Sequence, residues 1–151
     1  MKIGTALRDL HASEGDLARA LRRLAAEHPE EHEVFHVARD LAGWSEEHVR
    51  GVAEAARAYG EELGATAGEA PDQLSPAPAS ADGLELVRDL RRVAMRAYGV
   101  STEWVMVAQA AQAVRDQDLL ALCDRCHPGT LRQVRWANAT IKVLSPQTLT
   151  S

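Results

Sequence analysis

Two ionisable residues occupy positions that the apolar pattern assigns to helix interiors. From residue 3 to residue 24, large apolar side chains recur at alternating spacings of four and three, and Glu14 falls in this register where leucine would be expected. His48 falls in a second register of the same kind. A buried charge without a partner costs several kcal/mol, so each side chain needs one. We therefore expect Glu14 and His48 to hydrogen-bond to each other or to share a metal ion.

Three more ionisable side chains lie near the same level of the expected helices. A turn between the first two helices makes them antiparallel, which places His11 level with Glu47. With a rise of about 1.5 Å per residue, His48 then lies about one turn from Glu14. On the third helix, Glu103 lies beside the interior register. Carboxylate and imidazole groups bind iron, zinc or manganese, so the site is expected to hold one such divalent ion or none. Its predicted ligands are Glu14, His48, His11, Glu47 and Glu103.

A Cys-x-x-Cys-His sequence at residues 123–127 is formally a c-type haem attachment motif. Covalent haem attachment belongs to exported proteins, whereas residues 1–10 form a charged helical pattern without the apolar stretch of a signal peptide. Haem c held through Cys123, Cys126 and His127 is therefore an alternative that we do not favour.

A literal Glu-x-x-His sequence, Glu33 to His36, lies in the first turns of the second helix. It is about three turns from Glu14, so we regard the spacing as incidental. His28 and His32 lie at the same end of the bundle and could chelate a metal ion at spacings of four, but in a charged stretch we expect them to be solvated.

Periodicity predicts four helices, and their approximate bounds are 3–27, 30–63, 82–115 and 118–144. The segment 64–83 is rich in Ala, Pro and Ser and lacks periodicity, which indicates a connector. It is long enough to travel the length of a bundle, so the second and third helices are expected to run parallel.

The sequence also predicts interior residues of the last two helices and the places where the last helix bends and ends. Trp104 falls in the register of the third helix and is expected to be an ordinary core residue. Leu131 and Val134 are expected in the core of the last helix. Pro128-Gly129 is expected to kink that helix or split it, and Ser145-Pro146 to end it.

The composition favours one all-α domain. The chain has 151 residues, 46% of them hydrophobic and only 4% aromatic, which suits close helix packing. The net charge of −5 is modest and both signs interleave, so we expect no nucleic-acid partner. No apolar run approaches the ~20 residues that span a bilayer, and we expect a cytoplasmic protein. Fifteen arginines against two lysines, with abundant alanine, suggest a bacterial source.

Three stretches of the chain resemble the small ferritin-like proteins of bacteria: LHASEGDLARALRRLA at residues 10–25, LAGWSEEHVRGV at 41–52, and the stretch from WVMVAQ to SPQTL at 104–149. The resemblance implies a four-helix bundle with one long crossover, between the second and third helices. Members of that superfamily hold two irons, with one Glu from each of two helices and a Glu-x-x-His pair from each of the other two.

The match to that ligand pattern is partial. Glu14 corresponds to the carboxylate of the first helix and His48 to the histidine of the second, but Ser45 stands where the glutamate of the pair is needed. The last helix offers Leu131, Gln133, Val134 and Arg135 instead of a Glu-x-x-His pair. The resemblance therefore implies a diverged bundle without a complete di-iron centre.

We interpret the chain as a non-catalytic binding or structural module. A metal-binding protein or a di-iron-type oxidoreductase is the alternative. The broad apolar content of the second and third helices leads us to expect a homodimer.

Overall fold

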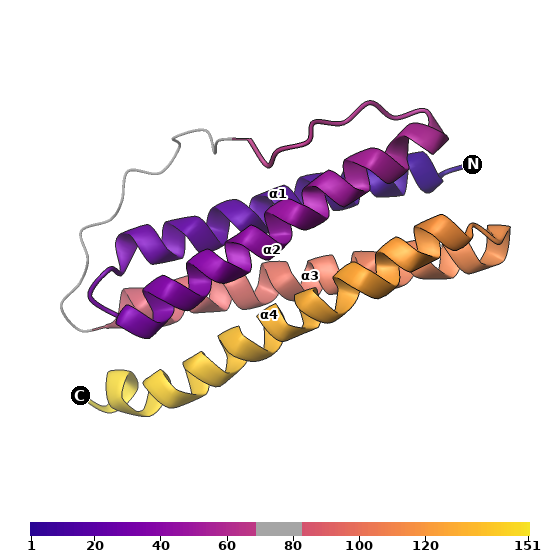
Figure 1. Cartoon of the computed structure of the whole chain (residues 1–151). Coiled ribbons are helices and arrows are strands. Elements are labelled where there is room, and N and C mark those ends of the chain that lie inside the picture. The colour runs from indigo at the N-terminus through magenta and orange to yellow at the C-terminus, as the bar shows by residue number, and fades with distance from the viewer. Residues whose placement is uncertain (69–82) are drawn as a thin grey trace.

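The amphipathic stretches of the chain form helices, as Figure 1 shows. The computed structural model describes residues 1–68 and 83–151, and within them there is no strand. The helices of these residues are α1 (Ile3–Glu27), α2 (His32–Ala56), the short 3-10 helix η1 (Arg57–Tyr59), α3 (Leu84–Val114) and α4 (Gln117–Thr150). The predicted all-α four-helix bundle is confirmed.

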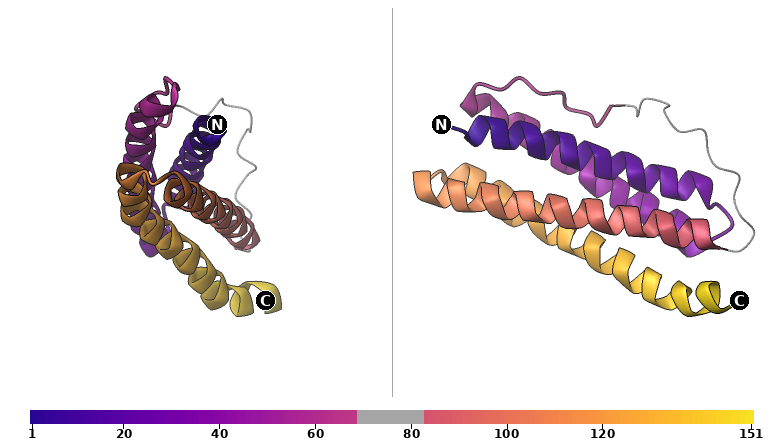
Figure 2. Two further views of the ribbon diagram at one scale, coloured as in Figure 1. Left: turned by 90° about the vertical axis from the view of Figure 1, so that its right-hand side faces the viewer. Right: turned by 180° about the vertical axis from the view of Figure 1, so that it is seen from behind.

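Two antiparallel helix pairs make up the bundle. α1 packs along α2, α3 packs along α4, and the two pairs meet mainly through α1 and α3. Figures 1 and 2 show that α2 and α3 run in the same direction, as expected for a long crossover between them. Residues 69–82 of the predicted crossover, and with them the predicted start of the third helix at 82, lie outside the described residues.

Large apolar side chains fill the interior at the predicted spacing. All six apolar positions predicted for α1 are buried: Ile3, Leu7, Leu10, Leu17, Leu21 and Leu24. Along α3 the predicted positions from Leu86 to Ala111 are buried as well, whereas Val114 is exposed. Glu14 keeps the register of its apolar neighbours and is fully buried.

The second helix ends earlier than the predicted residue 63. α2 stops at Ala56 and η1 continues only to Tyr59. Gly60 follows with φ of 79°, a left-handed conformation that glycine adopts without steric cost and that commonly ends helices. The amide of Glu61 then donates to the carbonyl of Ala56, which satisfies the helix end. Gly60 was the sequence signal for this helix end, but the prediction gave more weight to the apolar periodicity.

The last helix is longer than predicted and is not split. α4 runs from Gln117 to Thr150 through both of its prolines. A proline removes the hydrogen bond to the carbonyl four residues before it, which belongs to Asp124 for Pro128 and to Lys142 for Pro146. All four residues are exposed, so water can satisfy the freed carbonyls.

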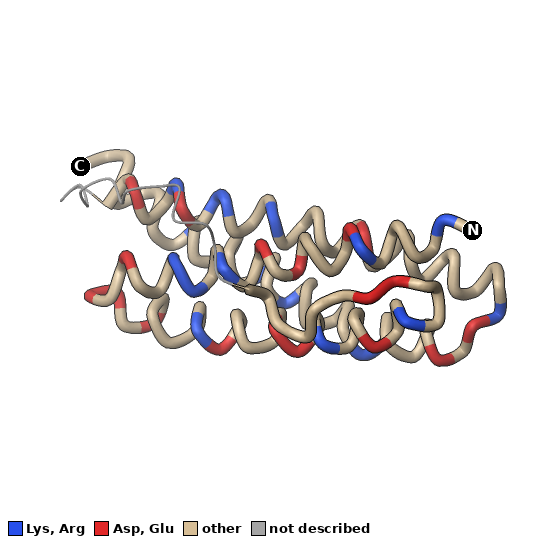
Figure 3. The backbone as a smooth tube through the Cα atoms, turned by 90° about the horizontal axis from the view of Figure 1, so that it is seen from above, with Lys and Arg blue, Asp and Glu red and all other residues tan. Residues whose placement is uncertain are grey.

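Acidic and basic positions are mixed along the helices. Figure 3 shows acidic and basic residues alternating along the helices instead of gathering on separate faces. Across residues 1–68 and 83–151, no helix has the combination of length and apolar content that crossing a bilayer requires.

Candidate functional site

The centre of the bundle contains a carboxylate that receives two hydrogen bonds. Oε2 of Glu14, on α1, lies 2.5 Å from Nδ1 of His48 on α2 and 3.2 Å from Nε1 of Trp104 on α3. The carboxylate accepts, so we assign the imidazole proton to Nδ1. Glu14 is 0% exposed and His48 8%. The predicted pairing of Glu14 with His48 is confirmed, and the pair extends to a third helix.

Trp104 has a role that sequence reasoning missed. Its position in the core was predicted, but its indole N–H was not recognised as a donor to Glu14. The edge-to-face arrangement of the His48 and Trp104 rings, with centroids 6.1 Å apart, lets both rings direct an N–H at the same oxygen. The signal was present in the sequence, because a tryptophan in a helix interior needs an acceptor for its N–H.

The other side of the His48 ring rests on a glycine of α4. A Cβ atom added to Gly129 would lie 3.5 Å from Nε2 and 3.4 Å from Cε1 of His48. These are ordinary van der Waals distances, so α4 packs closely against the ring at this position. Within the described part of the chain, Nε2 has no hydrogen-bond partner.

A second buried hydrogen-bond group joins α4 to α2. Nε2 of Gln133 donates to the carbonyl of Leu41 and to Oγ of Ser45, both at 2.9 Å. Gln133 and Ser45 are fully buried, and so is Thr130 one turn before Gln133.

The prediction that Leu131 lies in the core was wrong, whereas Val134 packs against the core as a half-buried residue. Leu131 is exposed and Val134 is half-buried, while Thr130 and Gln133 take the interior positions. The apolar pattern could not reveal this, because the interior stripe of α4 carries polar side chains here.

His11 and Glu47 do not join the Glu14–His48 pair. Nε2 of His11 donates to the carbonyl of Gly64, at 2.6 Å, and so holds the start of the crossover against α1. Glu47 is exposed. It precedes His48 by one residue, which turns its side chain by about 100° around the helix axis and away from the interior. The predicted levels along the helices did not account for this rotation.

Glu103 lies close to Glu14 without bridging to it. It is half-buried, and burial raises its pKa, whereas a hydrogen bond from Ser13 lowers it and the charges of Asp9 and Glu14 raise it further. Among the described residues, no third His, Cys, Asp or Glu places a ligand atom within 4.8 Å of both Glu14 and His48. The predicted set of five ligands is therefore not assembled, and a single metal ion at Glu14 and His48 remains a prediction.

The residues of the haem motif face the helix interfaces. Cys123 and Cys126 are buried free thiols, and Nε2 of His127 lies 2.9 Å from Oγ of Ser101. Burial raises the pKa of Cys123 to about 11 and that of Cys126 to about 12. The charge of Glu14 adds to the shift of Cys126, which reflects how near this thiol is to the central carboxylate.

The histidines at the start of α2 differ from one another. His32 and His36 are exposed, and His36 packs edge-on against Phe35, 5.1 Å between ring centroids. His28, which was also expected to be solvated, is buried. His28 contacts Asp89 on α3, and sequence spacing along one helix cannot reveal this contact.

Comparisons with protein-family models, with curated proteins and with solved structures give no match to this chain.

The buried thiols lead to a test of the haem motif. A thiol attacks only as its thiolate, and with pKa values of about 11 and 12 both cysteines are protonated at pH 8. We expect Ellman's reagent to leave both cysteines of the folded protein unreacted at this pH and to label two thiols per chain in guanidinium chloride. Rapid labelling of either thiol in the folded protein would contradict the burial.

Proposed function

We propose that this chain is a diverged ferritin-like bundle that acts as a non-catalytic binding or structural module in the bacterial cytoplasm. The observation that carries the proposal is the double hydrogen bond to Oε2 of Glu14. Both donors are protein side chains, His48 and Trp104, so this oxygen is satisfied without a metal ion. Two buried free thiols suit a reducing compartment.

The distribution of buried polar groups over the helices supports a ferritin-like origin. α1 contributes one carboxylate, Glu14, and α3 contributes the N–H of Trp104. α2 contributes Ser45 and His48, three residues apart, and α4 contributes Thr130 and Gln133 at the same spacing. Ferritin-like di-iron proteins carry Glu-x-x-His pairs on two helices. Hydroxyl and amide groups in three of the four pair positions are poor ligands for iron, which favours a structural role over redox chemistry.

In this proposal the buried hydrogen bonds fix the positions of the helices along their axes. Glu14 ties α1 to α2 and α3, and Gln133 ties α4 to α2. Sliding any of these helices by one turn would separate donors from acceptors in a place that water does not reach. Removing one partner of a buried ion pair typically costs about 3–5 kcal/mol, whereas replacing the whole pair by apolar residues is often neutral or stabilising.

Metal binding at the same place is the second candidate. Oε1 of Glu14 is buried and has no partner within the described residues. A histidine that gives one N–H to a carboxylate and keeps its other nitrogen free is also the usual arrangement of a metal ligand. A metal-handling protein or a di-iron-type oxidoreductase would use Glu14 and His48, with Glu103 the nearest further carboxylate. The haem alternative has less support, because both thiols of its motif are buried.

The bundle is also proposed to form a homodimer. Large apolar side chains are exposed on one side of α3: Met95, Tyr98, Val105 and Met106. Static light scattering at micromolar concentration is expected to give twice the chain mass of 16.4 kDa. A mass near 16.4 kDa would refute the dimer.

Variants of the central pair test the proposed role. We expect His48→Met alone to lower the free energy of unfolding by about 3–5 kcal/mol, because it leaves the Glu14 carboxylate buried with only one donor. The double variant Glu14→Leu, His48→Met is expected to be as stable as the parent or more stable. Urea denaturation followed by circular dichroism measures both.

Metal analysis of the same proteins separates the two candidates. Protein purified from cells grown with iron, zinc and manganese is expected to have the same metal content as its His48→Ala variant. About one metal ion per chain that disappears in His48→Ala would overturn the structural role and establish the metal-binding alternative.

A further inference from the structure

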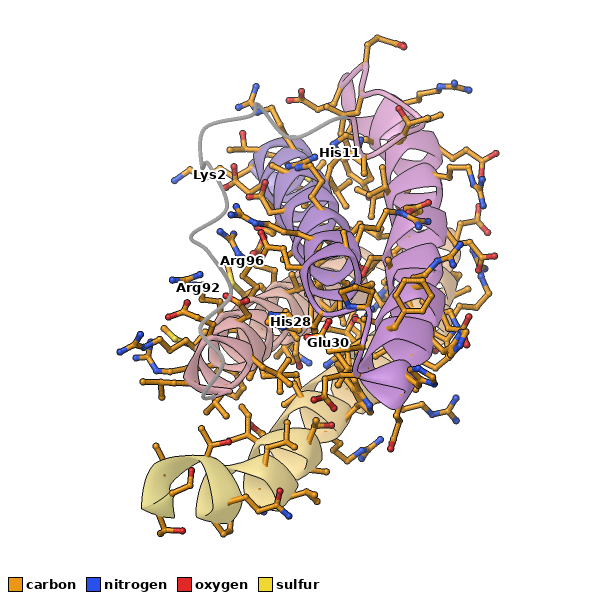
Figure 4. All side chains as sticks on the ribbon, turned by 90° about the vertical axis from the view of Figure 1, so that its left-hand side faces the viewer. Lys2, His11, His28, Glu30, Arg92 and Arg96 are labelled. Atoms are coloured by element: carbon orange, nitrogen blue, oxygen red, sulfur yellow. The ribbon has the colours of Figure 1, made fainter. Side chains whose placement is uncertain are left out.

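A buried histidine lies where the end of α1 meets the beginning of α3. His28 directly follows α1 and is 5% exposed, and its Nε2 lies 2.8 Å from Oδ2 of Asp89 on α3. Figure 4 looks onto this end of the bundle, with His28 and the nearby Arg92 labelled. The position is far from the central pair, since Glu14 and His28 are separated by about 20 Å along α1 at about 1.5 Å per residue.

A second carboxylate, that of Glu27, completes a group of three side chains that can bind a metal ion. Glu27, His28 and Asp89 each offer one ligand atom, and these atoms lie within 4.8 Å of one another. It is the one place in the described residues where three His, Cys, Asp or Glu side chains come so close. Glu27 and Asp89 also line a groove of about 500 Å³ between α1 and α3, which gives an ion and its water access.

Each of the two carboxylates accepts a hydrogen bond from an arginine. Nε of Arg23 donates to Oε1 of Glu27 at 2.6 Å, and Nη1 of Arg92 donates to Oδ1 of Asp89 at 3.0 Å. Groups that hydrogen-bond a ligating carboxylate from behind fix its orientation and are a regular part of metal sites. Here they leave Oε2 of Glu27 without a partner among the described residues and direct Oδ2 of Asp89 toward His28.

We propose that Glu27, His28 and Asp89 bind one divalent transition-metal ion, for which zinc is the best match. Imidazole and carboxylate groups both bind zinc, and at zinc sites with three protein ligands a water molecule supplies the fourth. Calcium, which needs six to eight oxygen ligands, matches this set poorly. The positive charges of Arg23 and Arg92 offset the negative charges of the two carboxylates. Zinc binding is therefore weaker than at a closed structural zinc site.

The bound ion would connect parts of the chain that are distant in sequence. Glu27 ends α1, His28 begins the connection to α2, and Asp89 lies in the second turn of α3. A metal ion bridging them fastens the α1–α2 pair to the α3–α4 pair at one end of the bundle. This site is independent of the proposed role of Glu14 and His48.

Calorimetric titration of zinc into metal-free protein tests the site. We expect one zinc ion per chain, and affinity lowered by more than about tenfold in each of Glu27→Gln, His28→Gln and Asp89→Asn. Glu27→Gln preserves the His28–Asp89 contact, so it remains informative if the other two variants unfold. His32→Gln and His36→Gln, which alter exposed histidines nearby, are the matched controls and should bind zinc as the parent does.

Two further measurements separate this site from the other metal candidates. His48→Gln is expected to retain zinc binding, and cobalt in place of zinc is expected to show no thiolate charge-transfer absorption, since Cys123 and Cys126 are not ligands. The proposal is overturned by absence of zinc binding to the parent protein, by unchanged affinity in Glu27→Gln, or by loss of binding in either control. Loss of zinc binding in His48→Gln, with zinc binding retained in Glu27→Gln, would overturn both this site and the structural role of the Glu14–His48 pair.

Discussion

The structure depends on how the hydrogen-bonding needs of a carboxylate inside the bundle are met. Glu14 has no contact with water, so hydrogen-bond donors must come from the neighbouring helices. His48 and Trp104 supply them from α2 and α3. In the proposed structural role this requirement fixes the relative heights of three helices, because apolar side chains alone would tolerate a shift along the helix axis better than a buried acid tolerates the loss of its donors.

The surroundings of the central pair follow from the same constraint. His48 donates to Glu14 through Nδ1, while Nε2 and Cε1 of its ring lie close to Gly129 of α4. Pro128, before this glycine, does not break α4, since Asp124, whose carbonyl loses its bond, is an exposed residue and water can satisfy that carbonyl. One turn further on, Gln133 donates to α2 through Leu41 and Ser45. The interior therefore combines an apolar core with a polar layer in which most donors have a defined acceptor.

Sequence periodicity predicted most of the fold and the contact between Glu14 and His48. It missed features that depend on the direction of a side chain around the helix axis, or on contacts between segments distant in sequence. The register of α1 placed Glu14 inside, and the parallel direction of α2 and α3 followed from the length of the crossover. Glu47 was predicted at the correct height but faces solvent. The interior of α4 was misjudged at Leu131 because Thr130 and Gln133 are polar. His28 is buried and hydrogen-bonded to Asp89, 61 residues away, and no local pattern encodes this contact.

The central claim is that Nδ1–H of His48 donates a hydrogen bond to the carboxylate of Glu14 inside the bundle. Proton NMR with ¹⁵N-labelled histidine observes this proton directly. We expect a single downfield Nδ1–H resonance that exchanges slowly with water and moves upfield in Glu14→Gln, because a neutral amide oxygen is a weaker acceptor than a carboxylate, while the spectrum otherwise remains that of a folded protein. A His48 ring whose Nδ1 proton exchanges rapidly with water, or whose Nδ1 carries no proton, would contradict it.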